Sequence, residues 1–133
     1  DMACVANNHG DVFCLDITDE RSDKNKESGS AEGSSKTPAA EGGDQRLKIV
    51  HSFRAHNKYI LKCLFSPNQK ILATASADWT INLWNTSKCG RPDAEPWSLW
   101  KTLQGHNRWV WDCAFSADSA YMVSASSDHT AKL

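Results

Sequence analysis

Residues 56–84 read HNKYILKCLFSPNQKILATASADWTINLW, and residues 106–133 read HNRWVWDCAFSADSAYMVSASSDHTAKL. Aligned from their histidines, the two stretches match without a gap far beyond chance. The identical pairs are His56/His106, Asn57/Asn107, Cys63/Cys113, Phe65/Phe115, Ser66/Ser116, Ala75/Ala125, Ser76/Ser126, Asp78/Asp128, Thr80/Thr130 and Leu83/Leu133. Self-similarity at a period of tens of residues is typical of proteins built from stacked structural units.

Each copy begins with two predicted β-strands. The runs YILKCLFS (59–66) and WVWDCAFS (109–116) combine aromatic, branched and other apolar residues, and the turn-forming sequences SPNQ and SADS end them. The runs KILATAS (70–76) and AYMVSAS (120–126) follow. Their near-continuous apolarity predicts strands that are buried on both faces.

Two further strands complete the unit. A tight turn centred on residues 77–79 leads into TINLW (80–84), and SLWKTLQGH (98–106) supplies a fourth strand before the second copy. Upstream, LKIVHSFRAH (47–56) supplies the same kind of strand before the first copy. Four short antiparallel strands per unit are typical of a β-propeller blade.

Composition narrows the functional classes. The formal net charge is −1, and 40% of the residues are hydrophobic, as in ordinary globular proteins. This charge does not favour binding to nucleic acid or to an anionic membrane by bulk electrostatics. No apolar run approaches the ~18 residues that a membrane span needs.

The stretch from Thr18 to Gln45 contains no Val, Ile, Leu, Met, Phe, Tyr, Trp or Cys. Such a segment buries too little apolar surface to offset the entropy of ordering it. We therefore expect a disordered insertion in a surface loop. A phosphorylation or docking segment is the alternative.

The cysteines do not form a metal-binding pattern, because none lies in a CxxC pair; they are Cys4, Cys14, Cys63, Cys89 and Cys113. Cys63 and Cys113 occupy equivalent places in apolar strands, where a reduced thiol packs as a small hydrophobe. A structural role in a reducing compartment is favoured over a metal site or a disulfide. We expect no cofactor and no bound metal.

The segments AH (55–56) and FSPNQKILATASADWTINLWN (65–85) resemble the WD repeat, with Trp84-Asn85 at the place of the usual Trp-Asp pair. The similarity is weaker over residues 2–17, where Leu15-Asp16 and His9 replace the family's residues. The resemblance implies an all-β fold, a partial WD-repeat β-propeller of two to three four-stranded antiparallel blades from a seven-bladed ring.

On this resemblance the chain divides into five segments. Residues 1–17 form strands of an incomplete blade, 18–45 the insertion, and 46–55 the last strand of that blade. Residues 56–105 form a complete blade and 106–133 a truncated one. We expect the sequence to be a piece of a longer protein, with about four more blades upstream and a tryptophan directly after Leu133. As an isolated piece it should be only marginally stable, because open blades leave strand edges unpaired.

Each copy contains a histidine, a serine or threonine, and an aspartate. These residues are compatible with two kinds of arrangement. They could form a hydrolase triad, but the sequence shows no nucleophile elbow and no glycine-rich donor loop. In WD repeats, residues at these positions form a buried hydrogen-bonded network, which we favour here. The resemblance assigns this structural network to His56, Thr74, Asp78, Trp84, His106, Ser124 and Asp128, with Ser76 as an alternative to Thr74. We therefore expect no enzyme activity.

The candidates for function are exposed loop residues at one end of the blades, which in this family is a common partner-binding face. Aromatic and basic residues dominate binding hot spots. The candidates are Asn57, Lys58, Tyr59, Trp79, Asn107, Arg108, Trp109 and His129. Tyr59 and Trp109 could instead pack against the next blade.

The run 55–84 together with RWVWDCAFSADSAYMVSASSDHTAKL (108–133) further resembles the last two blades of the Gβ-like subunits of the TOR kinase complexes. That resemblance implies a non-catalytic scaffold of TOR complexes 1 and 2. Its partners would be the catalytic domain of the TOR kinase and the other complex subunits. Its location would be cytoplasmic, with endomembrane association through the complex as an option. The alternative is another WD-repeat adaptor, such as a ubiquitin-ligase substrate receptor or a trafficking coat subunit.

Overall fold

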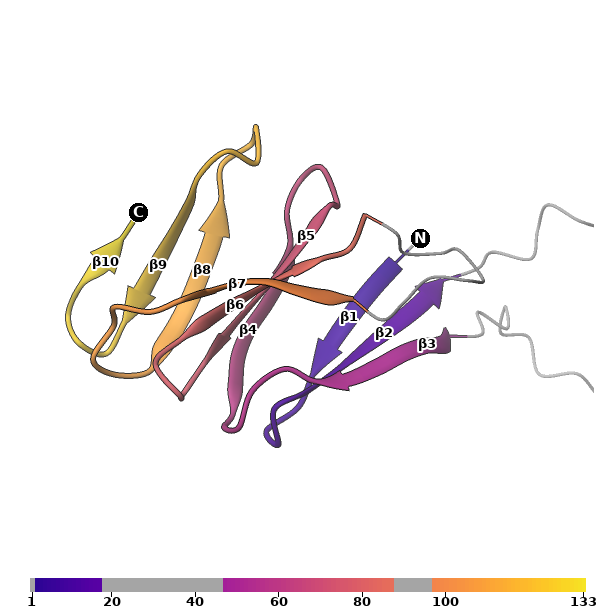
Figure 1. Ribbon diagram of the computed structural model, residues 1–133, viewed down its shortest axis with the longest axis horizontal. Helices are drawn as coiled ribbons and strands as arrows, with labels where there is room; N and C mark the ends of the chain where they lie inside the picture. The colour runs from indigo at the N-terminus through magenta and orange to yellow at the C-terminus, as the bar shows by residue number, and fades with distance from the viewer. Residues whose placement is uncertain (1, 18–46, 88–96) are drawn as a thin grey trace, which may run out of the picture.

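A computed structural model describes residues 2–17, 47–87 and 97–133. In this part of the chain ten strands form three antiparallel sheets that lie side by side, and no helix occurs (Figure 1). The prediction of an all-β fold made of antiparallel blades is therefore confirmed. The predicted insertion at 18–45 lies outside the described residues.

The first sheet contains β1 (Met2–Ala6), β2 (Asp11–Ile17) and β3 (Leu47–Arg54), in that order. The third contains β8 (Val110–Phe115), β9 (Met122–Ser126) and β10 (Ala131–Lys132).

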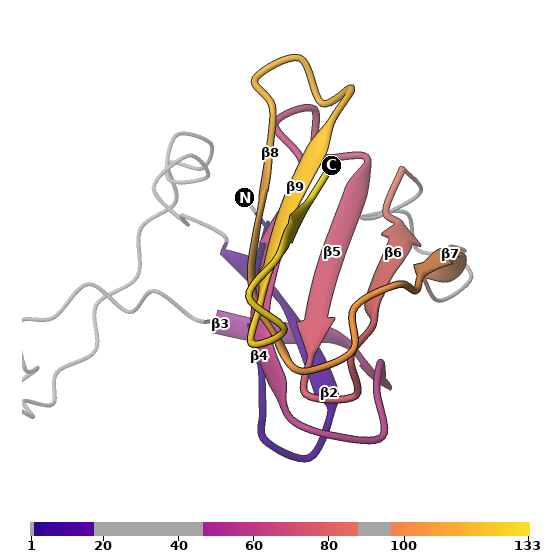
Figure 2. The same ribbon diagram turned by 90° about the vertical axis from the view of Figure 1, so that its left-hand side faces the viewer.

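Between them lies the four-stranded sheet, with the order β4-β5-β6-β7. Its strands are β4 (Ile60–Phe65), β5 (Ile71–Ser76), β6 (Ile81–Asn85) and β7 (Ser98–Leu103). Strands β4 and β8 contact each other, as do β1 and β4, so each sheet packs against the next at the side of these strands (Figures 1 and 2).

Irregularities in the ladders recur at equivalent positions. The β4–β5 register shifts between Ile60 and Lys62, and the β8–β9 register shifts between Val110 and Asp112. A further shift lies between Leu83 and Trp84 in β6, and its counterpart in the first sheet lies between Cys14 and Leu15 in β2. Because bulges bend and twist a strand, the sheets share a local shape as well as a strand order. The weak repeat at the start of the sequence thus shares one of these irregularities with the central sheet.

Two apolar clusters fill the seams between the sheets. One contains Val12, Leu72, Trp84 and Trp97 among its buried members, and the other contains Ile81 and Val110. Trp97, at the entry to β7, packs edge-on against Phe53 and Phe65 at centroid distances of 5.9 and 5.8 Å. Its side chain therefore ties the outer strand of one sheet to the next sheet.

Strand β5 is buried on both faces, as its apolar sequence predicts, but β9 is not. Val123 in β9 is 44% exposed. The reason is that β5 lies between two neighbouring sheets, whereas β9 has a neighbouring sheet on only one side within the described residues (Figure 1). The expectation of burial on both faces of residues 120–126 is therefore wrong for this structure.

Candidate functional site

A chain of hydrogen bonds links four polar side chains within the central sheet. Asp78 Oδ2 lies 2.8 Å from His56 Nδ1, and because a carboxylate only accepts, this ring nitrogen carries the proton. His56 Nε2 lies 2.8 Å from Thr74 Oγ1, to which the Trp84 indole N–H donates at 3.0 Å. The structure thus brings together the four residues that the sequence assigns to a network.

The strand positions explain this assembly. Thr74 and Trp84 lie on the adjacent strands β5 and β6, and Asp78 lies in the turn that joins those strands. His56 is held in the loop before β4, because its backbone N–H and that of Ala55 donate to the carbonyl of Gly10. A Cβ atom at Gly10 would lie 2.1 Å from the His56 carbonyl oxygen, so only glycine permits this close approach.

The carboxylate of Asp78 is held in its charged form. Partial burial raises its pKa, but hydrogen bonds from Thr80 and His56 outweigh this and lower the pKa below the ordinary value. Thr80 donates through its hydroxyl at 2.7 Å and its backbone N–H at 3.0 Å. Three donors therefore converge on one aspartate.

Ser76, the alternative to Thr74, lies elsewhere. Its hydroxyl donates to the Tyr59 carbonyl at 2.8 Å and accepts from the Asp78 backbone N–H at 3.2 Å. Ser76 thus fastens the turn to the loop before β4 and makes no bond to His56 among those of the described residues.

The second copy repeats the arrangement in the third sheet. His106 Nδ1 lies 2.8 Å from Asp128 Oδ2, and His106 Nε2 lies 2.9 Å from Ser124 Oγ. A hydrogen bond from Thr130 is the first of several that lower the pKa of Asp128 below its ordinary value.

The burial of these side chains does not favour a hydrolytic site. His56 is 4% exposed and Thr74 is fully buried, and the hydroxyl of Thr74 is shared between the imidazole and the indole. A nucleophilic hydroxyl must reach substrate beside a group that stabilises an oxyanion. Burial of Thr74 leaves no such access, so the chemistry that the arrangement supports is structural.

The predicted partner-binding residues lie together at the lower end of the sheets in Figure 1, in the loops before β4 and β8 and in the turns after β5 and β9. Tyr59 is 53% exposed, Trp79 48% and Trp109 41%, so none of the three is fully packed against a neighbouring sheet. Lys58 Nζ lies 5.9 Å from the centre of the Trp79 ring, within cation–π range. We call this set the loop-end surface; it comprises Asn57, Lys58, Tyr59, Trp79, Asn107, Arg108, Trp109 and His129.

Two members of the loop-end surface have left-handed backbone conformations. Trp79 has φ of 76° and His129 has φ of 65°, whereas the first hairpin has a glycine, Gly10, at the equivalent position. A bulky residue is strained in this region, and such strain often marks a functional position. Glycine would adopt this turn without strain, yet position 79 carries a large aromatic side chain that is exposed to solvent.

The structure adds residues that the sequence analysis missed. A pocket of about 420 Å³ opens on the loop-end surface, and Asn8, His9 and Arg54 line it together with Tyr59 and Trp109, among others. The alignment of His9 with Asp78 could have predicted this location, because it places the tip of the first hairpin at the same end. Trp111 was also missed; its ring centre lies 5.6 Å from that of Trp109, and its indole donates to Ser127.

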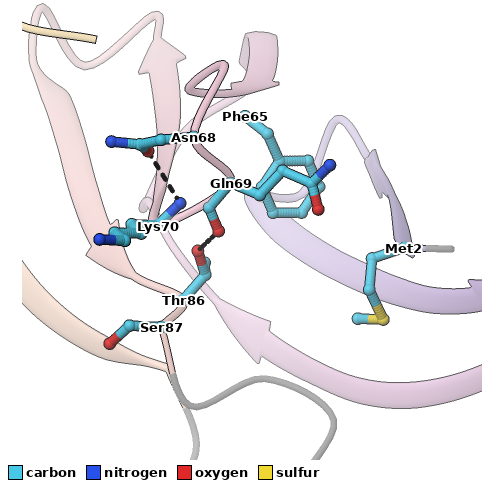
Figure 3. Close-up of a pocket in the computed structure, with 7 residues that line it drawn as sticks. All are labelled: Met2, Phe65, Asn68, Gln69, Lys70, Thr86 and Ser87. Carbon is cyan, nitrogen blue, oxygen red and sulfur yellow. Dashed lines mark hydrogen bonds between the residues drawn. The ribbon is translucent and has the colours of Figure 1, made fainter.

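A second pocket, of about 360 Å³, lies at the opposite end of the sheets, where Met2 faces the turn after β4 (Figure 3). Its polar groups serve local structure. The Thr86 hydroxyl donates to the Gln69 carbonyl at 2.8 Å, and the Asn68 side-chain oxygen accepts from the Lys70 backbone N–H at 3.0 Å. These contacts shape the turn.

Over residues 2–17, 47–87 and 97–133, no three His, Cys, Asp or Glu side chains are grouped so that they could hold a metal ion. The same residues include no helix of the length and apolarity needed to cross a membrane.

Comparison with known proteins gives short but strong matches to one group. The chain is 58% identical over 36 residues to the target of rapamycin complex subunit LST8-1 of Arabidopsis thaliana. It is 53% identical over 44 residues to the target of rapamycin complex subunit wat1 of Schizosaccharomyces pombe, and 54% identical over 41 residues to the protein LST8 homolog of Dictyostelium discoideum. These matches cover 27%, 33% and 31% of this chain, but only 12%, 14% and 14% of the relatives.

A family profile covers more of the sequence than any of these relatives. The profile described as "WD domain, G-beta repeat" matches residues 47–85 and 97–133. These residues contain the strands of the second and third sheets and both histidine–aspartate pairs. By its repeat, its sheets and this match, the chain belongs to the WD-repeat family, and within it resembles the LST8 proteins.

Proposed function

We propose that this protein is a non-catalytic subunit of TOR complexes 1 and 2, where it binds and stabilises the catalytic domain of the TOR kinase. The observation that carries the proposal is the identity of 53–58% to proteins whose names describe them as subunits of the target of rapamycin complex. Because the matches are short, the activity and partners of the whole protein rest on this proposal. We place the protein in the cytoplasm, associated with endomembranes through its complex.

The loop-end surface supplies a physical basis for partner binding. Three large aromatic side chains, Tyr59, Trp79 and Trp109, are 41–53% exposed within one region. Exposed clusters of aromatic and basic residues favour protein interfaces, since tryptophan, tyrosine and arginine contribute most of the energy at binding hot spots. Lys58 and Arg108 add positive charge beside these rings, which favours a partner segment with apolar and acidic side chains.

The rigidity of the blades supports the scaffold role. The loops that carry the aromatic residues are fixed by the buried networks, because Asp78 anchors the turn that bears Trp79 and Asp128 accepts from the backbone N–H of Asn107. A surface held in this way loses little conformational entropy on binding. Buried polar networks thus serve binding by fixing the loops, without taking part in a reaction.

Affinity purification of the tagged full-length protein from its own cells tests the proposal. We expect the TOR kinase to be the main co-purifying protein. Replacement of Lys101, an exposed residue of β7 outside the loop-end surface, by alanine should leave this recovery unchanged. Recovery of a ubiquitin ligase or a vesicle coat in place of the kinase would overturn the proposal in favour of another class of adaptor.

A further inference from the structure

Two cysteines from different sheets face each other across a seam. Cys4 lies on β1 and Cys63 on β4, and their sulfur atoms are 3.8 Å apart. Cys63 Sγ also lies 3.9 Å from the carbonyl oxygen of Cys4. Both residues are only partly buried, so small oxidants can reach them. Strands β1 and β4 contact each other across this seam (Figure 1).

The pair contains one activated thiol. The hydrogen bond from Cys4 lowers the pKa of Cys63 to about 7 despite partial burial, and the charge of Lys62 and a backbone hydrogen bond from Ala6 act in the same direction. The interaction with Cys63 in turn raises the pKa of Cys4. Because the thiolate is the nucleophile in thiol chemistry, Cys63 is poised to react first at neutral pH.

The next seam supplies an internal reference. There Cys113 occupies the position equivalent to Cys63, and Ala73 occupies the position equivalent to Cys4. Burial raises the pKa of Cys113 to about 12, which makes it unreactive. The thiol pair therefore occurs in the first seam, whereas the second seam has alanine in place of one of the two cysteines.

We propose that Cys4 and Cys63 form a reversible disulfide that joins the first sheet to the second when the protein meets a peroxide. The Cys63 thiolate attacks a peroxide oxygen, and Cys63 becomes a sulfenic acid while hydroxide, or alkoxide from an organic peroxide, leaves. The Cys4 sulfur then attacks the sulfenic sulfur, and the Cys4 proton leaves with the hydroxyl group as water. One peroxide is reduced as two thiols are oxidised, and a small-molecule dithiol reverses the reaction by exchange.

The geometry permits this bond. A disulfide requires the sulfurs to approach to about 2 Å, and the two sulfurs already lie 3.8 Å apart. Conversion of Cys63 to the neutral sulfenic acid alters the hydrogen bond and removes the charge through which Cys63 raises the pKa of Cys4, while burial continues to raise it. Cys14 pairs with Cys4 across the β1–β2 ladder but is fully buried. The oxidant therefore reaches Cys63 and not Cys14.

The consequence is a redox-dependent change in the coupling of two blades. The bond closes a loop of about sixty residues, from position 4 to position 63, and long closed loops restrict the unfolded chain most strongly. We expect oxidation to raise the melting temperature of the full-length protein by about 5–10 °C. This inference is independent of the proposed partner.

Peptide mapping of the full-length protein tests the inference. After brief exposure to a small excess of hydrogen peroxide and alkylation of free thiols, a non-reducing digest should contain a peptide that joins Cys4 to Cys63. Dithiothreitol should remove it. In Cys4→Ala, which copies Ala73 of the next seam, the cross-link should be absent and a sulfenic-acid trap should label Cys63. In Cys113→Ala, the cross-link should form as in the wild type.

Two results would overturn the inference. One is a cross-link between Cys4 and Cys14 with Cys63 fully alkylated. The other is the absence of any cross-link in wild-type protein whose Cys63 is alkylated no faster at pH 7 than Cys113. Both readouts use the wild type, so they hold even if a variant fails to fold.

Discussion

Individual buried polar residues contribute to the stability of these blades. His56 and Thr74 are buried, and a buried donor or acceptor that loses its partner costs about 1–3 kcal/mol. Asp78 is the point at which the chain of hydrogen bonds meets the surface, because its side chain is 23% exposed. Changes at Asp78 therefore test the network without creating a large cavity.

The first prediction concerns the substitution Asp78→Ala. It should reduce the free energy of unfolding of the full-length protein by about 1–3 kcal/mol, because the His56 N–H loses its acceptor. Urea denaturation followed by tryptophan fluorescence measures the change. Lys101→Ala should shift the free energy by less than about 0.5 kcal/mol. Equal stability of Asp78→Ala and the wild type would show that the network contributes nothing.

The second prediction concerns pH. Because the pKa of Asp78 is lowered in the folded state, its charge stabilises the fold fully above the unfolded pKa of about 4. This stabilisation is lost as the pH falls through the lower folded-state value. The advantage of the wild type over Asp78→Asn should therefore be constant from pH 7 to 5 and shrink below about pH 4. Denaturation series at several pH values would contradict this if the advantage grew in acid.

The third prediction separates stability from binding at one residue. Trp79→Gly should leave the melting temperature unchanged or slightly raised, since glycine adopts the positive φ of 76° without strain. Gly10 already occupies the equivalent position of the first hairpin. Differential scanning calorimetry measures this. A loss of several degrees would mean that Trp79 is a packing residue and not an exposed contact.

At the scale of elements, an aromatic residue contributes to stability when it packs in the seam between two sheets. Trp97 and Trp100 flank the same outer strand, but Trp97 is 8% exposed and Trp100 is 61% exposed. The difference follows from tertiary packing, because Phe53 and Phe65 come from other strands.

This difference gives the fourth prediction. Trp97→Ala should lower the free energy of unfolding by about 3–5 kcal/mol, because it removes a large buried side chain and leaves a cavity between sheets. Trp100→Ala should change it by no more than about 0.5 kcal/mol. Chemical denaturation of the two variants side by side measures both effects. Similar losses in the two variants would refute the assignment of Trp97 to the seam.

Strand order, turns and the internal repeat could be predicted at this scale because they depend on local sequence. Alternating and continuous apolar runs predict strands, and the turn residues limit their ends. Burial could not be predicted equally well. Strands β5 and β9 have similar sequences, yet β9 has a sheet against only one face in the described residues. The contact between Cys4 and Cys63 could not be predicted either, because nothing in the sequence indicates that these two distant residues meet.

For the whole molecule, the residue types of both networks could be predicted because the repeat and the family resemblance supply two independent alignments. The loop-end surface stays a prediction as a partner-binding face. Its loops follow from the strand order, but Asn8 and Arg54 come beside it through the packing of the first sheet against the second. Trp111 lies beside Trp109 within the third sheet. Because of the similarity to subunits of the target of rapamycin complex, we propose the TOR kinase as the partner of this surface. Binding of that kinase is the central proposal.

The most direct test is the affinity of the purified full-length protein for the purified catalytic domain of the TOR kinase, measured for three forms. The wild type should bind, and Trp79→Gly should bind at least about tenfold more weakly, as expected when an aromatic hot spot is lost. Trp100→Ala, which removes an exposed tryptophan outside the loop-end surface, should bind as the wild type does. Absence of wild-type binding, or equal affinity of all three forms, would contradict the account.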